Sequence, residues 1–248
     1  MWLKITRNYS PNFSTTKRIK KKIKYIIIHY TGMRSAQESI KRLKSKKHKV
    51  SSHYFIDRSG IVSQLVMDHN VAWHAGVSFW GRDKNLNQNS IGIELQNKGY
   101  EFGYEKYTKK QIRSLINLLS NLKEKYNVRD SFILGHSDIA SFRKSDPGYL
   151  FPWNELAKKG IGLSLKKKLK SKKVLTVNQI TKLQKLFSEF GYKISINGLM
   201  DQETLHVIHA FESHFCPEEL DEFSVKEKIM AYLKALIKAK KQNLTKKR

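Results

Sequence analysis

Two histidines and one aspartate, far apart in the chain, have side chains that could bind one metal ion together. His29 follows three isoleucines and His136 follows Ile133-Leu134-Gly135, so each ends an apolar run typical of a buried strand. Asp146 lies in a later Lys-Ser-Asp-Pro-Gly segment. Two imidazoles and a carboxylate fill three corners of a tetrahedral zinc site and leave the fourth for water, as in catalytic sites. The sequence therefore predicts a metal-dependent hydrolase.

Each of these residues also has a simpler interpretation. A single histidine after a strand is more often a hydrogen-bonded structural residue than a metal ligand. Asp146 precedes Pro147, which favours an extended backbone, and residues two apart in an extended segment share a face. Lys144 is then expected on the same side as Asp146, next to the oxygen that a metal would bind. Without a metal, the two would form an exposed ion pair worth less than about 1 kcal/mol.

Glu94 is a candidate for the floor of the same site. In the segment from Ile91 to Gln96, apolar residues alternate with Gly92, Glu94 and Gln96, so Glu94 faces away from the isoleucines. Gly92 leaves room on that face. The alternative is a solvent-facing glutamate on an edge strand, and the segment alone does not exclude it.

The chain carries a formal charge of +27 from 48 basic and 21 acidic residues, and a field of that strength attracts polyanions. Nucleic acid is one candidate, but only ten of the basic residues are arginines, which make bidentate contacts to phosphate and guanine. The lysine runs at 17–24, 166–173 and 238–248 also lack aromatic residues on which bases could stack. We therefore favour a solvated lysine surface over specific nucleic-acid binding, and the charge also suits a carboxylate-rich substrate.

Length and composition predict a folded protein with a sizeable core. The 248 residues, 40% of them hydrophobic and 11% aromatic, suffice for one large or two modest domains. No stretch approaches the ~18 consecutive apolar residues of a membrane span, and residues 1–13 show no apolar core of a secretory signal. Cys216 is the only cysteine, so a metal site would use nitrogen and oxygen ligands.

The first part of the chain alternates predicted strands and helices. β-Branched content and bounding turns predict strands at 23–30, 53–57, 61–66, 91–96 and 131–136, with Arg58-Ser59-Gly60 as a hairpin turn. Ser35 with Glu38 and Thr108 with Gln111 have the spacing of capping boxes, which predicts helices after them. The order of elements predicts an α/β or α+β sheet domain.

The pattern changes after Leu156. Residues 158–173 are rich in glycine and lysine and have little periodicity, which is typical of a linker. Three helical segments follow, and their ends are marked by Thr176 with Gln179, Gly191, Asp201, and Ser224 with Glu227. We predict a catalytic domain over residues 1–163, a linker over 164–174, and a small three-helix domain with a basic tail over 175–248.

Six motifs, in a fixed order, make this sequence similar to a known family. They are Ile26 to Thr31 (IIIHYT), Ser52-His53-Tyr54, Ala72 to Gly76 (AWHAG), Ser90 to Glu94 (SIGIE), Gly135 to Ala140 (GHSDIA) and Arg143 to Gly148 (RKSDPG). Over residues 9–163 the chain resembles the zinc N-acetylmuramoyl-L-alanine amidases related to peptidoglycan recognition proteins, most closely their AmiD-like branch. The resemblance implies an α/β fold with a mixed central sheet flanked by helices.

The resemblance also implies a role for each candidate residue. One Zn²⁺ per chain would be bound by His29, His136 and Asp146, with Glu94 as the catalytic carboxylate and Lys144 as the cation that stabilises the transition state. Arg143 and His74 would line the substrate groove. Ser141-Phe142 departs from the pattern, because the family usually has Pro-Gly before the Arg-Lys pair. This departure is expected to alter the loop and its fit to substrate while removing no ligand.

The C-terminal part resembles a helical peptidoglycan-binding module more loosely, through Leu183 to Leu186, Phe190-Gly191-Tyr192, Asn197-Gly198 and Asp201 to Thr204. The implied activity is hydrolysis of the amide between N-acetylmuramic acid and L-alanine, in peptidoglycan or muropeptides. The alternative is a protein that binds muropeptides without cleaving them. Such a substrate implies the bacterial cell envelope, with the cytoplasm as the alternative. The sequence does not indicate an oligomeric state.

Overall fold

The computed structural model describes residues 4–15, 18, 23–165, 169, 173–220 and 225–245. Its centre is a six-stranded mixed sheet with the strand order β1-β5-β4-β9-β3-β10. The strands are β1 (Ile5–Arg7), β3 (Tyr25–Tyr30), β4 (Tyr54–Ile56), β5 (Val62–Gln64), β9 (Ser90–Leu95) and β10 (Ile133–Gly135). Five of them are the predicted strands: four are shorter than predicted, and β9 has the predicted length but begins one residue earlier. The sixth, β1, was not predicted, because its three residues lie exposed at the sheet edge without a period-two pattern.

Parallel pairing brings the ends of the central strands together. Strand β3 pairs in parallel with β10 on one side and with β9 on the other, and β9 pairs in parallel with β4. In the β3–β9 register, His29 lies opposite Glu94. Strands β4 and β5 form the predicted antiparallel hairpin, and Gly60 in its turn has φ +88°, which favours glycine.

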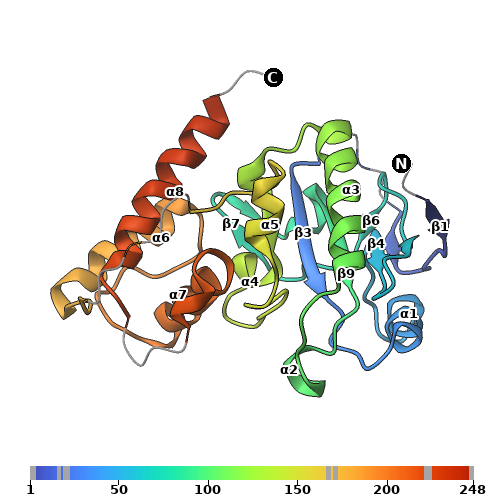
Figure 1. Ribbon diagram of the computed structural model, residues 1–248, viewed down its shortest axis with the longest axis horizontal. Helices are drawn as coiled ribbons and strands as arrows, with labels where there is room; N and C mark the ends of the chain where they lie inside the picture. Colours follow the sequence, from blue (N-terminus) through green and yellow to red (C-terminus); the bar gives the residue numbers. More distant parts are fainter. Residues whose placement is uncertain are drawn as a thin grey trace.

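One face of the sheet is covered by helices α3 (Lys109–Tyr126) and α5 (Trp153–Lys158), which lie in front of it in Figure 1. Ile26 and Ile28 of β3 and Ile91 and Ile93 of β9 pack in this layer. Helix α3 begins with the predicted capping box, in which Thr108 and Gln111 bond to each other's backbone N–H groups. Helix α1 (Ala36–Lys44) is capped by Ser35, whose side chain accepts from the Glu38 N–H.

The other face carries α1, which packs on Phe55 and Leu65, and several short elements. Two-stranded pairs are formed by β2 (Phe13–Ser14) with β6 (Val71–Ala72) and by β7 (Phe79–Trp80) with β8 (Asp83–Lys84). The single-turn helices α2 (Gly99–Phe102) and α4 (His136–Ile139) connect the longer elements. The mixed sheet flanked by helices confirms the predicted fold class.

The C-terminal part is helical, as predicted. It contains α6 (Ile180–Phe190), α7 (Gln202–Phe215) and α8 (Lys228–Thr245). Helix α6 ends at Gly191, and Asp201 caps α7 by accepting from the Thr204 N–H. The predicted start of the third helix at Ser224 lies outside the described residues. Figure 1 shows these helices in orange and red beside the sheet, with α8 leading to the C-terminus.

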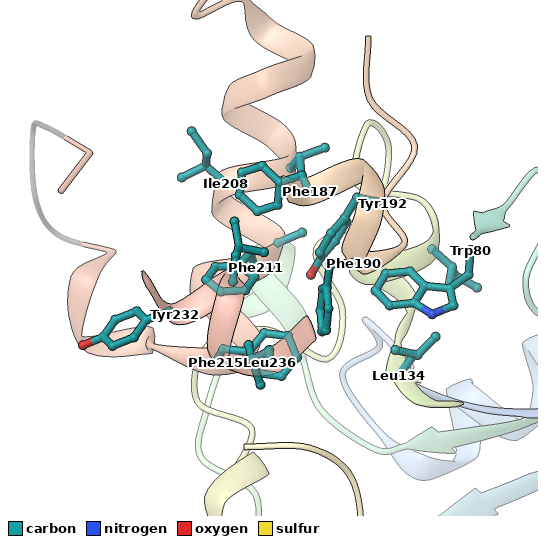
Figure 2. Close-up of a cluster of buried hydrophobic side chains, with 14 of the residues drawn as sticks. Trp80, Leu134, Phe187, Phe190, Tyr192, Ile208, Phe211, Phe215, Tyr232 and Leu236 are labelled. Atoms are coloured by element: carbon teal, nitrogen blue, oxygen red, sulfur yellow. The ribbon is translucent and has the colours of Figure 1, made fainter. Parts of the chain in front are cut away.

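The C-terminal helices and the sheet share one buried hydrophobic cluster. Trp80 and Leu134 face Phe187, Phe190 and Tyr192 across the junction (Figure 2). Cys216, at the end of α7, is 1% exposed within the same cluster. The division at 163 and 174 stays a prediction, but the two predicted domains are joined by apolar packing.

A buried polar bridge accompanies this packing. Asp138 of α4 accepts from the Tyr192 hydroxyl (2.6 Å), from His214 Nδ1 (2.7 Å) and from the Gly135 N–H (2.7 Å). The imidazole of His214 in turn stacks on the ring of Trp153, with 3.7 Å between centroids. The segment that carries His136 is thus tied directly to α7 and to Tyr192, two residues after the end of α6.

None of the described helices is long and apolar enough to cross a membrane.

Candidate metal centre and active site

The fold brings the three predicted ligands to one edge of the sheet. His29 is near the end of β3, and His136 is the first residue of α4, directly after β10. Because β3 and β10 are parallel neighbours, their carboxyl ends lie side by side. Asp146 lies in the loop after α4, where its carbonyl oxygen accepts from the Ser137 N–H at 2.9 Å. This backbone bond holds the aspartate next to the histidine segment.

The three side chains point one atom each at a common point. The distances are 3.0 Å between His29 Nδ1 and His136 Nδ1, and 3.1 Å from each nitrogen to Asp146 Oδ2. In a tetrahedral zinc site with bonds of ~2.0 Å, neighbouring ligand atoms would lie about 3.3 Å apart. The three side chains are buried, and they form the one group of histidine, cysteine, aspartate or glutamate residues in the described part of the chain that could hold a metal ion. The donor set therefore fits a zinc ion.

The electrostatic state of the ligands also suits a cation. Burial and the neighbouring His136 lower the pKa of His29 to about 4, so its ring is neutral at physiological pH and its Nδ1 lone pair is available. Burial alone would raise the pKa of Asp146, but the two neighbouring histidines, His136 above all, outweigh it and hold that pKa below its ordinary value. A neutral imidazole and an ionised carboxylate are the forms that bind metal.

Both candidate ligand histidines use their second ring nitrogen for a bond within the protein. His136 Nε2 lies 3.2 Å from the Ala75 carbonyl oxygen, and His29 Nε2 lies 3.0 Å from His74 Nδ1. Such bonds set the ring orientation of a metal-binding histidine and the position of its hydrogen. With Nε2 as the donor, each Nδ1 is left free to bind the ion.

Glu94 lies next to the three ligands on an interior strand. Strand β9 runs between β3 and β4, so the edge-strand alternative does not apply. The Oε2 atom of Glu94 is buried without a hydrogen-bond partner among the described residues. Burial and the negative charge of Asp146 raise the pKa of Glu94 well above its ordinary value, while the Lys144 cation offsets part of the rise. A cation bound to Asp146 would neutralise its negative charge and so remove that cause of the raised Glu94 pKa.

A groove of about 700 Å³ opens over the cluster, lined by both ligand histidines, Asp146, Glu94 and Lys144. Lys144 is exposed to solvent on its wall. Arg143 also lines the groove, but its guanidinium donates to the carbonyl oxygens of Ala75 and Val77, the latter at 2.8 Å from Nη2. It thereby holds the 75–77 loop, which carries the acceptor for His136. Arg143 thus lines the groove and also holds the loop whose Ala75 carbonyl oxygen contacts His136.

His74 lines the groove, as the resemblance implies, and lies deep within it. It lines the floor with only 8% of its surface exposed, because it packs between His29 and Ser90. Sequence reasoning missed Ser90 and the Ala75 carbonyl oxygen. No sequence pattern marks either of them, because a serine at the start of a strand and a backbone oxygen become partners of the site histidines only when the chain folds. Gly92 was the exception, because a glycine in a strand indicates a close approach.

The family model for N-acetylmuramoyl-L-alanine amidases matches residues 19–149, which contain every candidate site residue. The chain belongs to this amidase family. It is 34% identical over 213 residues to the N-acetylmuramoyl-L-alanine amidase AmiD of Escherichia coli, an alignment that covers 79% of this chain and 76% of that protein.

Two solved structures of relatives match nearly the whole chain, including its C-terminal helices. The E. coli amidase AmiD, in complex with the substrate anhydro-N-acetylmuramic acid-L-Ala-D-γ-Glu-L-Lys, matches with a TM-score of 0.79 and 30% identity, covering 91% of this chain and 92% of that one. AmpDh3 of Pseudomonas aeruginosa matches with a TM-score of 0.74 and 30% identity, covering 92% and 96%. The amidase sheet and the helices beside it thus recur together in both relatives.

Proposed function

We propose that this amidase hydrolyses the amide between N-acetylmuramic acid and L-alanine of peptidoglycan or muropeptides, with one Zn²⁺ per chain. The observation that carries the proposal is the convergence of His29, His136 and Asp146 on one point beside Glu94. The relative AmiD, solved with an anhydromuramyl peptide, supports the substrate class. The groove of about 700 Å³ above these residues is the place where such a peptide would bind.

A zinc ion held by His29, His136 and Asp146 would lower the pKa of a water molecule toward ~7, which would make hydroxide available at neutral pH. Glu94 accepts the proton of the attacking water and returns it to the leaving amine, a role that depends first on its position. Lys144 stabilises the negative charge that develops on the carbonyl oxygen, a preorganised interaction worth ~3 kcal/mol. Asp146 and the two histidines would hold the metal in place.

The test is release of free stem peptide from purified sacculi and from defined muropeptides, read by mass spectrometry. We expect release with zinc, its loss on chelation, and its return when zinc is added back. His29→Ala should abolish release, whereas His48→Ala, at an exposed histidine outside the cluster, should not. Undiminished release by metal-free protein would refute the zinc mechanism.

A muropeptide-binding protein without hydrolytic activity is the main alternative, and binding to sacculi without peptide release would favour it. Nucleic-acid binding is a weaker alternative: it predicts DNA affinity with a steep salt dependence that His29→Ala leaves unchanged. A gel shift in ~150 mM salt tests this, and we expect no specific complex. We propose the bacterial cell envelope as the site of action, with the cytoplasm as the alternative. Parallel digestion of sacculi and of anhydromuramyl peptides shows which substrate is preferred.

A further inference from the structure

A chain of hydrogen bonds runs inward from the metal ligand His29. His29 Nε2 lies 3.0 Å from His74 Nδ1, and His74 Nε2 lies 3.1 Å from Ser90 Oγ. The Ser90 hydroxyl donates to the Leu86 carbonyl oxygen at 2.6 Å. His29, His74 and Ser90 are all buried. The chain ends on a backbone oxygen, which can only accept a hydrogen bond.

That end point fixes the direction of every bond. The Ser90 hydrogen goes to Leu86, so Ser90 Oγ must accept from His74 Nε2. A neutral His74 with its hydrogen on Nε2 has a bare Nδ1, which accepts from His29 Nε2. His29 then carries its hydrogen on Nε2 and presents a lone pair at Nδ1. That is the nitrogen that points at His136 and Asp146.

The sheet is shaped to hold this chain. In the β3–β9 register, Tyr25 lies opposite Ser90, Ile27 opposite Gly92, and His29 opposite Glu94. The His74 ring lies over Gly92, where an added Cβ would come within 2.4 Å of its Cγ. His74 therefore spans from the first residue of β9 to the end of β3 through a space that only glycine leaves open.

We propose that His74 and Ser90 are positioning residues for the metal site: they orient His29 and fix its hydrogen on Nε2, so that Nδ1 is ready to bind zinc. This inference deepens the proposed function and rests on it for the identity of the metal. It also gives His74 a different role from contact with substrate. Both of its ring nitrogens are engaged within the protein, which leaves neither for a ligand in the groove.

The first test is the zinc affinity of Ser90→Ala, measured by competition with a chromophoric chelator. The substitution touches no metal ligand, yet it removes the acceptor that sets the hydrogen on His74. Loss of such an outer partner weakens metal binding by about 10- to 100-fold, and we expect a change of this size. The matched control is Ser131→Ala, at a buried serine whose Oγ has no hydrogen-bond partner among the described residues. It should bind zinc as tightly as the parent protein.

The melting temperature of the metal-free protein and its rise on zinc addition separate positioning from a merely structural role. A structural role lowers the metal-free melting temperature and leaves the zinc-induced rise unchanged. A positioning role shrinks the rise, because stabilisation by a ligand depends on its dissociation constant. Parent-like zinc affinity and an undiminished rise in Ser90→Ala would overturn the proposal.

A pair of substitutions at His74 gives a second, independent measurement. His74→Asn places an amide oxygen near the position of Nδ1 and can still accept from His29, whereas His74→Leu cannot. We expect His74→Asn to bind zinc more tightly than His74→Leu, and equal affinities would contradict the inference. These experiments measure metal binding alone. If the parent protein bound zinc but released no stem peptide, the proposed function would fail while the inference on His29 stood.

Discussion

At the scale of single residues, the candidate ligands could be picked out from the sequence, whereas the residues that support them could not. His29, His136 and Asp146 have the side-chain chemistry of metal ligands, and the two histidines end apolar runs, so their types and places indicated a shared site. Ser90 is an ordinary serine in the sequence and becomes informative only when His74 is seen to contact it. Roles that depend on a hydrogen bond between distant segments cannot be inferred from one segment.

Glu94→Gln tests the catalytic carboxylate. The amide has nearly the same shape but cannot accept the proton of the attacking water, so we expect kcat to fall by about 10²- to 10⁴-fold. Zinc affinity should change little, because Glu94 is outside the ligand cluster. Steady-state release of stem peptide, with a parallel zinc titration, measures both. Retention of parental kcat would show that another group carries the proton.

Gly92→Ala tests the space under His74. The new methyl group would overlap the imidazole, so His74 must move and lose its contact with His29. We expect lower stability by about 1–3 kcal/mol, the usual cost of overpacking, together with weaker zinc binding. Urea unfolding and chelator competition give the two quantities. Unchanged stability and unchanged zinc affinity would mean that the His74 ring moves aside without consequence.

At the scale of elements, the predicted strands and capped helices are present because their signals are local. Thr108 and Gln111 cap α3 within four residues, and the turn at Gly60 joins β4 to β5. The contacts between α3 and the sheet are less local, and besides the apolar layer they include a polar network around Asp68. Asp68, after β5, accepts from the hydroxyl groups of Tyr54 (2.6 Å) and Tyr126 (2.5 Å) and pairs with Lys125 (2.7 Å). It thereby joins β4 to the last turn of α3.

Asp68→Asn should loosen this link and change the dependence of stability on pH. Burial alone would raise the pKa of Asp68, but hydrogen bonds from Lys125, Tyr126 and Tyr54 outweigh it and lower the pKa. A depressed carboxyl pKa adds stability above the unfolded value of ~3.9 and loses it as the pH falls below that value. We expect the substitution to cost about 2 kcal/mol at neutral pH, the scale of a hydrogen bond to a charged group.

Urea midpoints of the two proteins, compared at neutral and at acidic pH, check this expectation. The difference between the two urea midpoints should narrow as the pH drops below the unfolded pKa. The parent protein then loses the stabilisation from the ionised Asp68 carboxylate, which the variant lacks at every pH. A gap that stays constant with pH would show that the carboxyl charge of Asp68 contributes nothing to stability.

At the scale of the whole molecule, the sequence indicated a separate C-terminal unit from its change of composition. Composition reports on each segment by itself and not on what its helices pack against. The structure adds a continuous buried cluster between Trp80 and Leu134 on one side and Phe187, Phe190 and Tyr192 on the other (Figure 2). Gly191 is required at this junction, because a Cβ there would lie 2.7 Å from the Trp80 ring.

A chain cut after residue 163 should therefore fold poorly, although it keeps every candidate catalytic residue. Truncation would expose Trp80 and Leu134 and leave Asp138 without two of its three hydrogen-bond donors. We expect loss of the cooperative thermal transition seen by circular dichroism. Tyr192→Phe, which removes one donor and keeps the packing, should cost about 1.5–3 kcal/mol. A truncated protein with parental melting and activity would instead support an independent catalytic domain.

The burial of Cys216 offers a practical advantage for spectroscopy. Its thiol is enclosed by the helical cluster, and burial raises its pKa, so little nucleophilic thiolate forms. A maleimide reagent should therefore leave the native side chain unmodified while the protein is folded. One cysteine introduced on the surface can then carry a fluorophore or spin label, without first replacing the cysteine that the chain already has.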